Sequence, residues 1–302
     1  MSNKIMIIGT GNVGASIAFS IINQRTSVHE LVLTDINAED AKGEAMDLSD
    51  ALSVAPSSPK ISYGTYSDAH DCDIVVITAG AAQKPGETRM DLLKKNAAII
   101  KGIVTEVVDS GFDGIFLVIS NPVDVLTYLT WQYSGFPSEK VIGSGTVLDS
   151  ARLRQKLSES LNISSKSVHA YQIGEHGDTE FALWSLSSVN GQPITSLLSA
   201  PKLIEIENQV KNEAYEIIQK KGATYYGIGI CAARIIDIIL NDENYILPVS
   251  SYDDFTDVYN GFPTVLGRGG VVRRLNLKMT EQEGIKFQKS NNALKKAIKS
   301  IS

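Results

Sequence analysis

The stretch that most constrains the fold lies at the N-terminus, where a short apolar run, Lys4–Ile8, leads into the glycine pattern of Gly9–Gly14. That hexapeptide, GTGNVG, is followed at once by the apolar helical pattern of residues 15–22. An apolar run of this length is typical of a strand buried on both faces. The glycines allow a tight turn, and the N-terminus of the following helix then faces a pyrophosphate. Strand, G-x-G-x-x-G and helix in this order predict a dinucleotide-binding unit.

A second apolar segment, Glu30–Thr34, ends in Asp35, an acid 21 residues after Gly14. A carboxylate there can hold the ribose hydroxyls of adenosine and repel a 2′-phosphate, which favours NAD over NADP. A glycine-rich turn that only packs a helix on a sheet is the alternative, and the acid at this spacing disfavours it. The cofactor-binding residues predicted in this unit are Gly9, Gly11, Val13, Gly14 and Asp35.

Strand and helix patterns go on alternating along the first half of the chain. Four further strands are predicted at Lys60–Tyr63, Asp73–Thr78, Ile115–Ile119 and Val141–Ser144, with helical stretches between them. This alternation predicts an α/β fold with a doubly wound parallel Rossmann sheet, here placed in residues 1–145. We expect an α+β substrate and catalytic domain in residues 146–302.

A ligand of such a sheet lies beyond the carboxyl ends of its strands. Three segments occur at predicted strand ends: residues 78–80, 120–124 and 143–145. We therefore add Thr78, Ala79 and Gly80 to the predicted cofactor-binding residues. The loop of residues 81–89 follows, and its Gly, Pro and charged residues without apolar periodicity predict a mobile loop that could close as a lid. A solvated surface loop is the alternative.

The second half contains a histidine on a tight turn, Gly174-Glu175-His176-Gly177-Asp178. Histidine has an unperturbed pKa near neutrality, so it suits a proton that is transferred in both directions. The alternative is an ordinary polar loop residue. Upstream, a helix is predicted to begin near Leu148. Asp149 and Arg152, three residues apart, share one face of it, whereas Arg154 points to nearly the opposite side.

The remainder of the chain reads mostly as helix. A long helical region from Pro201 to about Leu240 is broken near Gly222, and it places Thr224 and Ile228 on one face. Strand character resumes at residues 245–249 and 252. Residues 261–272, with Pro263, are predicted to be a glycine-rich connection. A final helix is expected from about residue 281, where Thr280 and Glu283 fit a capping box.

Composition limits the classes of partner. A formal net charge of −6 without a basic cluster argues against a nucleic-acid partner. No apolar run approaches a membrane span, so no membrane partner is expected. The two cysteines, Cys72 and Cys231, show no pairing pattern, which predicts a reducing cytoplasm.

Together these motifs resemble the NAD-dependent lactate/malate dehydrogenase superfamily, and most closely the bacterial L-lactate dehydrogenases of glycolysis and fermentation. The resemblance covers essentially the whole chain. Its five motifs occur in the family's order: Gly9–Gly14, Gln83–Arg89, Ser120–Asp124, Asp149–Arg152 and Gly174–Asp178. It implies the cofactor NAD and the reversible reduction of pyruvate to L-lactate, and we assign no metal ligands.

The resemblance also implies the catalytic roles. His176 matches the proton donor and acceptor, with Asp149 as its orienting carboxylate. Arg152 matches the two-pronged clamp on the substrate carboxylate, and Arg89 arrives with the closing loop to polarise the reacting carbonyl. These roles suit the chemistry, because hydride transfer to a ketone develops negative charge on its oxygen, and an imidazolium and an arginine neutralise it.

Further matches concern the pocket. Asn121 matches a residue near both nicotinamide and substrate, Thr224 one that lines the substrate pocket, and Ile228 an apolar residue beneath the nicotinamide. Gln83 stands where a malate dehydrogenase would have an arginine to pair with the second carboxylate of oxaloacetate. A dehydrogenase for malate or for longer or branched 2-hydroxy acids, and a non-catalytic NAD-binding protein, are the alternatives.

Regulation is implied by one further pair. Arg154 and His169 match residues that bind fructose bisphosphate across a subunit interface in allosteric bacterial lactate dehydrogenases. Such an effector site requires a homo-oligomer, a dimer or tetramer, in which two subunits contribute the same residues symmetrically. An exposed arginine and an ordinary strand histidine are the alternative.

Overall fold

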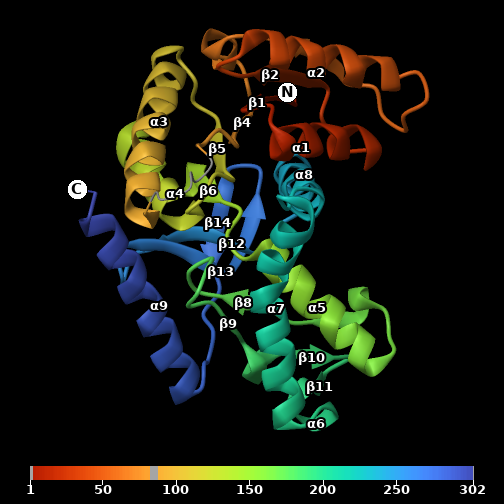
Figure 1. The fold of residues 1–302 in the computed structure, drawn as a ribbon, viewed down its shortest axis with the longest axis vertical. Coiled ribbons are helices and arrows are strands. Elements are labelled where there is room, and N and C mark those ends of the chain that lie inside the picture. The colour runs from red at the N-terminus through yellow and green to blue at the C-terminus, as the bar shows by residue number, and fades with distance from the viewer. Residues whose placement is uncertain (1–2, 82–87, 302) are drawn as a thin grey trace.

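The computed structural model describes residues 3–81 and 88–301 of the 302-residue chain, as a central sheet covered by helices on both faces (Figure 1). The strands of the central sheet are β1 (Lys4–Ile8), β2 (Glu30–Thr34), β3 (Lys60–Tyr63), β4 (Ile74–Ile77), β5 (Ile115–Val118), β6 (Val141–Gly143), β12 (Tyr245–Asp253), β13 (Val258–Gly267) and β14 (Gly270–Arg274). The helices are α1 (Asn12–Asn23), α2 (Ala38–Ala51), α3 (Arg89–Asp109), α4 (Val123–Ser134), α5 (Val147–Leu161), α6 (Ile194–Leu197), α7 (Ala200–Lys221), α8 (Tyr226–Leu240) and α9 (Glu281–Lys299).

The order of the described strands in this sheet is β14-β13-β12-β6-β5-β4-β1-β2-β3. Strands β1 to β6 are parallel, so the predicted doubly wound parallel sheet is confirmed. The direction of winding reverses between β1 and β4, and ligands of such sheets bind in the crevice at this point. Three antiparallel strands from the second half of the chain extend the sheet beyond β6.

Strand β1 shows why the sheet is buried on both faces. Ile5 and Ile7 pack toward α1, α2 and α8, while Met6 and Ile8 pack toward α3, α4 and α9. All four side chains are at most 1% exposed. Successive strand residues point to opposite faces, so a strand between two helical layers needs apolar residues at every position.

A smaller unit of short strands and helices lies beside the sheet, at the lower right of Figure 1. Its strands are β7 (Val168–His169), β8 (Gln172–Ile173), β9 (Phe181–Ala182), β10 (Ser188–Val189) and β11 (Gln192–Pro193). Leu153 and Leu157 of α5 pack against Ile206 and Val210 of α7. Gly222, with a φ of 86°, ends α7, so the predicted break before α8 is confirmed.

The prediction of a glycine-rich connection at residues 261–272 is wrong. Most of this segment belongs to β13, whose ten residues are all buried, and to β14. Pro263 lies opposite Pro248 of β12. The carbonyl groups of both prolines point away from this pair, toward Leu275 N–H and Thr146 N–H. The missing proline N–H groups therefore remove no bond between β12 and β13, although proline normally disfavours a central strand.

Among the described helices, none combines the length and the apolar character that a membrane-spanning segment requires.

The turn between β1 and α1 is tightly packed. A Cβ atom on Gly14 would lie 1.9 Å from the carbonyl oxygen of Gly9, and Gly9 itself has a φ of 101°. Gly14 therefore lets the first turn of α1 approach the end of β1 more closely than any side chain permits.

We predict that Gly14→Ala lowers the free energy of unfolding by about 1–3 kcal/mol or more, the usual cost of overpacking. Gly102→Ala is the matched control, because Gly102 lies in α3 and a Cβ there meets no atom within 4 Å. That control should stabilise the protein by roughly 0.5–1 kcal/mol, because alanine favours the helix. Urea unfolding of both variants measures the difference, and equal effects would contradict the packing account.

Candidate active site

A cavity of about 440 Å³ lies between the carboxyl edge of the parallel strands and the smaller unit, a size typical of small-molecule sites. Its walls come from both halves of the chain. Seven of the residues predicted from the sequence line it: Val13, Asn121, Asp149, Arg152, His176, Thr224 and Ile228. The structure thus brings together residues that lie up to 215 positions apart in the chain.

His176, Asp149 and Arg152 form one hydrogen-bonded group in this cavity. The Nδ1 atom of His176 lies 2.8 Å from Oδ2 of Asp149, and Nη1 of Arg152 donates to Oδ1 of Asp149 at 2.7 Å. The Asp149 side chain is only 4% exposed, whereas 27% of the His176 side chain is accessible. The contact with Arg152 confirms the prediction that residues 149 and 152 share a helix face.

The charges fix the protonation of the histidine. Burial alone would lower the pKa of His176, but the negative charge of Asp149 and its hydrogen bond to Nδ1 raise the pKa above the ordinary value. Burial likewise opposes ionisation of Asp149, and His176 and Arg152 overcome it, so its pKa is lowered. At neutral pH the imidazole is therefore protonated, and both ring nitrogens carry hydrogen.

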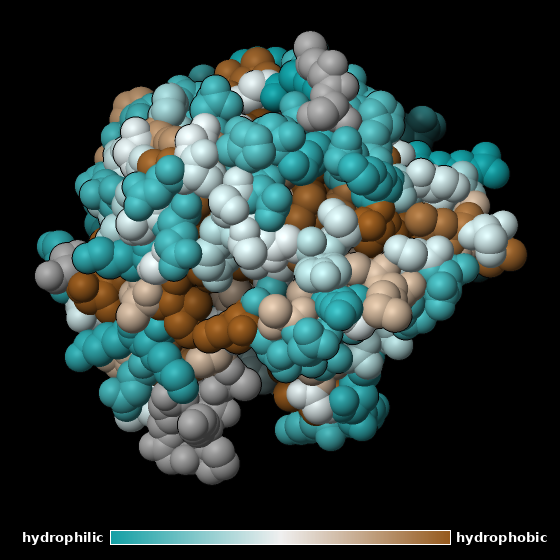
Figure 2. Space-filling model, turned by 90° about the horizontal axis from the view of Figure 1, so that it is seen from above, coloured by the Kyte–Doolittle hydropathy of each residue, from teal (hydrophilic) through white to brown (hydrophobic). Residues whose placement is uncertain are grey.

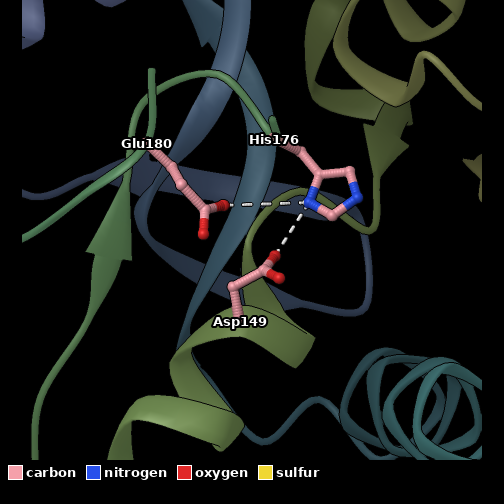
Figure 3. A group of neighbouring side chains, drawn as sticks. All are labelled: Asp149, His176 and Glu180. Carbon is pink, nitrogen blue, oxygen red and sulfur yellow. Dashed lines mark hydrogen bonds and ion pairs between the residues drawn. The ribbon is translucent and has the colours of Figure 1, made fainter. Parts of the chain in front are cut away.

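A second carboxyl group, Glu180, lies beside the His176–Asp149 pair (Figure 3). Its Oε2 is 4.0 Å from Nδ1 of His176, and Gln172 Nε2 donates to its Oε1 at 3.4 Å. Burial, followed by the charge of Asp149, raises the pKa of Glu180 well above its usual range. Burial therefore favours the neutral form of Glu180. In the sequence Glu180 carries no signal except its position two residues beyond the His176 turn.

Figure 3 shows both carboxyl groups on the Nδ1 side of the His176 ring, with the other ring nitrogen turned away from them. Together with the imidazole of His176, these two carboxyl groups could in principle ligate a cation. However, both oxygens of Asp149 are already bonded to cationic side chains, and Nδ1 of His176 carries the hydrogen that bonds Asp149. We therefore interpret the group as an acid–base pair with Nε2–H as its free donor.

The cofactor residues surround the end of β1. Backbone N–H of Thr10 donates to Oδ2 of Asp35 at 2.7 Å, and Oγ1 of Thr78 donates to the carbonyl of Gly9 at 2.6 Å. A Cβ on Gly9 would meet the backbone of Ala79 at 2.7 Å. These contacts hold the glycine turn against the ends of β2 and β4, where the sequence placed it.

The turn also offers a place for a phosphate. A Cβ on Gly11 would meet no atom within 4 Å, so the approach to this backbone is open. Helix α1 has no side-chain cap, which leaves its first N–H groups available to an anion. Asp35 is half-buried at the adjacent strand end. The residues present therefore fit an adenine dinucleotide, and Val13 at the start of α1 lines the cavity, whereas Gly80 is exposed beyond β4 and does not line it.

Two predicted substrate residues cannot be placed. Gln83 lies outside the described residues, and Arg89 is the first residue of α3 with a side chain that the structure does not describe. The predicted closing loop falls mostly in the same undescribed segment. Its far end is defined, because Thr88 caps α3 by accepting a hydrogen bond from Asp91 N–H.

Arg154 and His169 line a second cavity of about 460 Å³ on the opposite side of α5. Lys166, Tyr171 and Tyr245 also line it, so the cavity holds two basic side chains besides the histidine. Arg152 faces the first cavity and Arg154 the second, as the helical spacing predicted.

Side chains that the sequence analysis did not assign hold the backbone of the His176 turn. The N–H of His176 donates to Oδ2 of Asp124 at 2.7 Å, and the N–H of Glu175 donates to Oγ of Ser290 at 2.6 Å. Asp124 lies in the motif that supplied Asn121, but nothing in the local sequence showed which segment it would contact.

Comparison with known families agrees with this geometry. The lactate/malate dehydrogenase NAD binding domain family matches residues 3–143, and the lactate/malate dehydrogenase alpha/beta C-terminal domain family matches residues 146–302. L-lactate dehydrogenase 1 of Bacillus cereus is 51% identical over 98% of this chain and 97% of its own length. The L-lactate dehydrogenase of Bacillus velezensis is 52% identical over 97% of this chain and 95% of its own.

Solved structures show the same likeness. The minor L-lactate dehydrogenase of Enterococcus mundtii, in a ligand-bound form, superposes with a TM-score of 0.98 at 46% identity, covering 100% of this chain and 99% of that chain. A lactate dehydrogenase from a Medee basin deep-sea metagenome gives a TM-score of 0.97 at 47% identity, covering 99% of this chain and 98% of that chain.

We predict that Asp149→Asn lowers the pKa of His176. Without the negative charge, burial dominates, so the imidazole loses its proton at a lower pH than in the wild-type protein. The chain has four histidines, so NMR titration of their ring protons resolves His176. Glu159→Gln is the control, because Glu159 is an exposed acid on the same helix. An unchanged His176 midpoint in Asp149→Asn would show that the pairing does not set the protonation.

Proposed function

The chain belongs to the lactate/malate dehydrogenase family, and we propose that it is an L-lactate dehydrogenase that reduces pyruvate reversibly to L-lactate with NADH. The main support for this proposal is the His176–Asp149 pair. It leaves Nε2–H of a protonated imidazole free to donate in a cavity that Arg152 also lines. Relatives about half identical over nearly the whole chain bear this name.

His176 acts as the acid in the reductive direction. Nε2 donates a proton to the ketone oxygen as negative charge develops there, and the neutral imidazole accepts it back in the oxidation of lactate. Asp149 holds Nδ1 and thereby fixes both the tautomer and the ring orientation. When bound, NADH supplies the hydride. A histidine whose pKa is raised keeps this proton at neutral pH.

Arg152 binds the substrate carboxylate in this scheme. Its side chain is 9% exposed and lines the cavity, with one guanidinium nitrogen already bonded to Asp149. The remaining N–H groups can form two parallel bonds to a carboxylate, which lysine cannot reproduce. Thr224 lies in the loop before α8 rather than on one helix face with Ile228, yet both residues line the cavity and supply a polar and an apolar wall. From the resemblance, Arg89 polarises the ketone.

A second set of residues would hold and orient the cofactor. The glycine turn and the N-terminus of α1 bind the pyrophosphate, Asp35 binds the adenosine ribose, and Ile228 and Asn121 flank the nicotinamide. Pyruvate rather than oxaloacetate is the substrate, because Gln83 is a neutral amide. An amide cannot pair with a second carboxylate, and it does not oppose a methyl group.

We expect His176→Gln to lower the rate of pyruvate reduction by about 10²–10⁴-fold, the usual value of acid–base catalysis. NADH binding should be retained, because the glycine turn that binds it is untouched. His70→Gln is the matched control, since His70 is an exposed histidine whose side chain is 58% accessible. Loss of NADH absorbance gives the rate and fluorescence titration the affinity. Near-normal turnover by His176→Gln would refute the assignment.

Cofactor choice offers a separate test. Asp35 should make the enzyme prefer NADH to NADPH, because two like charges roughly 4 Å apart repel by about 1–4 kcal/mol in a surface environment. Asp35→Asn keeps an oxygen that accepts the hydrogen bond from Thr10 N–H but removes the negative charge. The preference for NADH over NADPH should therefore be smaller in this variant. The ratio of kcat/KM for the two cofactors measures it, and equal ratios in both proteins would exclude this role.

The second cavity supports an effector site for fructose bisphosphate. Arg154 and Lys166 carry positive charge in this cavity, which His169 also lines, and like charges repel one another. A phosphate relieves this repulsion by accepting charge-assisted hydrogen bonds. Because Arg154 and Arg152 lie on the same helix α5, an effector that moves Arg154 also moves the residue that binds pyruvate.

We predict that fructose bisphosphate lowers the KM for pyruvate, with a coupling of about 1–3 kcal/mol. Arg154→Gln and His169→Ala should abolish the effect. Arg273→Gln, an exposed arginine that lines neither cavity, should not. Pyruvate saturation curves with and without the sugar, recorded at several pH values, decide the matter. Identical curves would leave Arg154 and His169 without this function.

An effector site shared between subunits requires that the protein self-associates. Figure 2 views the molecule from the end where α1 and α2 lie and shows hydrophobic residues interrupting a hydrophilic surface. Phe19 of α1 and Ile230 of α8 are each 55% exposed, on two helices that pack together. We propose a homo-oligomer, a dimer or tetramer, that covers such residues. Its place is the cytoplasm, where Cys72 and Cys231 stay reduced as the free thiols seen here.

A further inference from the structure

The catalytic turn is held by side chains from elements distant in the sequence. His176 N–H donates to Asp124 Oδ2 at 2.7 Å, and Glu175 N–H donates to Ser290 Oγ at 2.6 Å. Asp124 lies in the first turn of α4 and Ser290 in α9, so two helices that are distant in the sequence fix adjacent residues of one turn.

Asp124 is itself held in place. Ser250 of β12 donates its hydroxyl to Oδ1 of Asp124 at 2.5 Å, and the carboxyl group is 3% exposed. Each oxygen therefore has one partner, and neither partner belongs to α4. An acid in a first turn often serves its own helix by capping it. Asp124 instead accepts hydrogen bonds from His176 and from Ser250 of β12, so it links the catalytic turn to the sheet rather than capping α4.

We propose that Asp124 is a positioning residue for His176, whose carboxylate fixes the backbone of the turn and whose negative charge supports the protonated imidazole. The inference rests on the proposed function in that His176 is the acid. It adds a buried acid that contacts neither substrate nor cofactor and acts only through the histidine.

The charged groups around this contact are few. Asp124 faces the turn residues His176 and Glu175, while the imidazole also faces Asp149 and Glu180. Burial raises the pKa of Asp124 to about 6, so the group is ionised at neutral pH. Its charge then adds to that of Asp149 in favouring the cationic form of His176.

The contact between Asp124 and His176 also couples the catalytic turn to Asn121. Asn121, which lines the cavity, lies three residues before Asp124, in the segment that leads into α4. The segment that contributes a side chain to the cavity thus also holds the backbone of the proton donor. A displacement of one of these groups displaces the other, and misplacement by about 1 Å can cost 10²-fold in rate.

Two variants separate position from charge. Asp124→Ala removes both hydrogen bonds and should lower kcat/KM for pyruvate by about 100-fold while changing NADH affinity much less. Asp124→Asn keeps an oxygen for His176 N–H and can donate to the Ser250 hydroxyl, so it should recover most of that loss at low pH. Without the charge, its His176 should lose the ring proton at a lower pH than in the wild-type protein.

Asp237→Ala and Asp237→Asn are the matched controls. Asp237 also accepts a backbone N–H from a distant segment, Ser27 at 3.0 Å, but it does not line the cavity. These variants should change stability without changing kcat/KM or the His176 titration. If Asp124→Ala does not fold, Ser290→Ala, which releases the N–H of Glu175 and the hydroxyl of Thr179 but leaves His176 N–H on Asp124, takes its place with a smaller loss of kcat/KM.

Steady-state kinetics and NMR titration of the four histidines give the result. Wild-type kcat/KM in the Asp124→Ala protein, or the same His176 midpoint in the Asp124→Asn and wild-type proteins, overturns the proposal. An inactive wild-type enzyme would instead refute the proposed function, and the NMR midpoints, which need no substrate, would still test this inference.

Discussion

The site depends on one buried carboxylate. Asp149 can stay ionised in a nearly inaccessible position only because Arg152 bonds one oxygen and His176 the other. Removing one partner from such a buried group costs about 3–5 kcal/mol, because the remaining charge is left unpaired. The same pairing keeps the imidazole protonated and turns its Nε2 toward the cavity. The pairing of Asp149 with His176 and Arg152 therefore both stabilises the buried carboxylate and keeps a proton on the imidazole.

That carboxylate sits where the two halves of the chain meet. The parallel strands supply the glycine turn and Asn121, and the first turn of α5 supplies Asp149. The antiparallel extension of the sheet reaches behind the catalytic turn, where Gly174 and Gly261 exchange hydrogen bonds of 2.9 and 2.8 Å. The turn is thus joined to the sheet by its backbone and to two helices by side chains, which explains how a short exposed loop can orient a proton donor.

Short-range patterns predicted much of this arrangement. The spacing of Gly9–Gly14 from Asp35 gave the cofactor turn, and helical geometry alone separated Arg152 from Arg154. These predictions concern residues whose relation is fixed within one helix or one strand–helix–strand unit. Strand β13 was missed because Pro263 is a local breaker, and it is tolerated only because its backbone points away from β12 at this position of the pairing. Asp124 and Ser290 contact the turn across 52 and 115 residues, a distance over which one sequence carries no signal.

The most direct test of the central claim is substrate choice with product identity. Purified protein with NADH should be assayed with pyruvate, oxaloacetate and a branched 2-oxoacid, comparing kcat/KM and resolving the product by chiral chromatography. The structure and family membership predict the highest kcat/KM for pyruvate and L-lactate as the product. A higher kcat/KM for oxaloacetate or for the branched acid, or no consumption of NADH with any of the three, would contradict it.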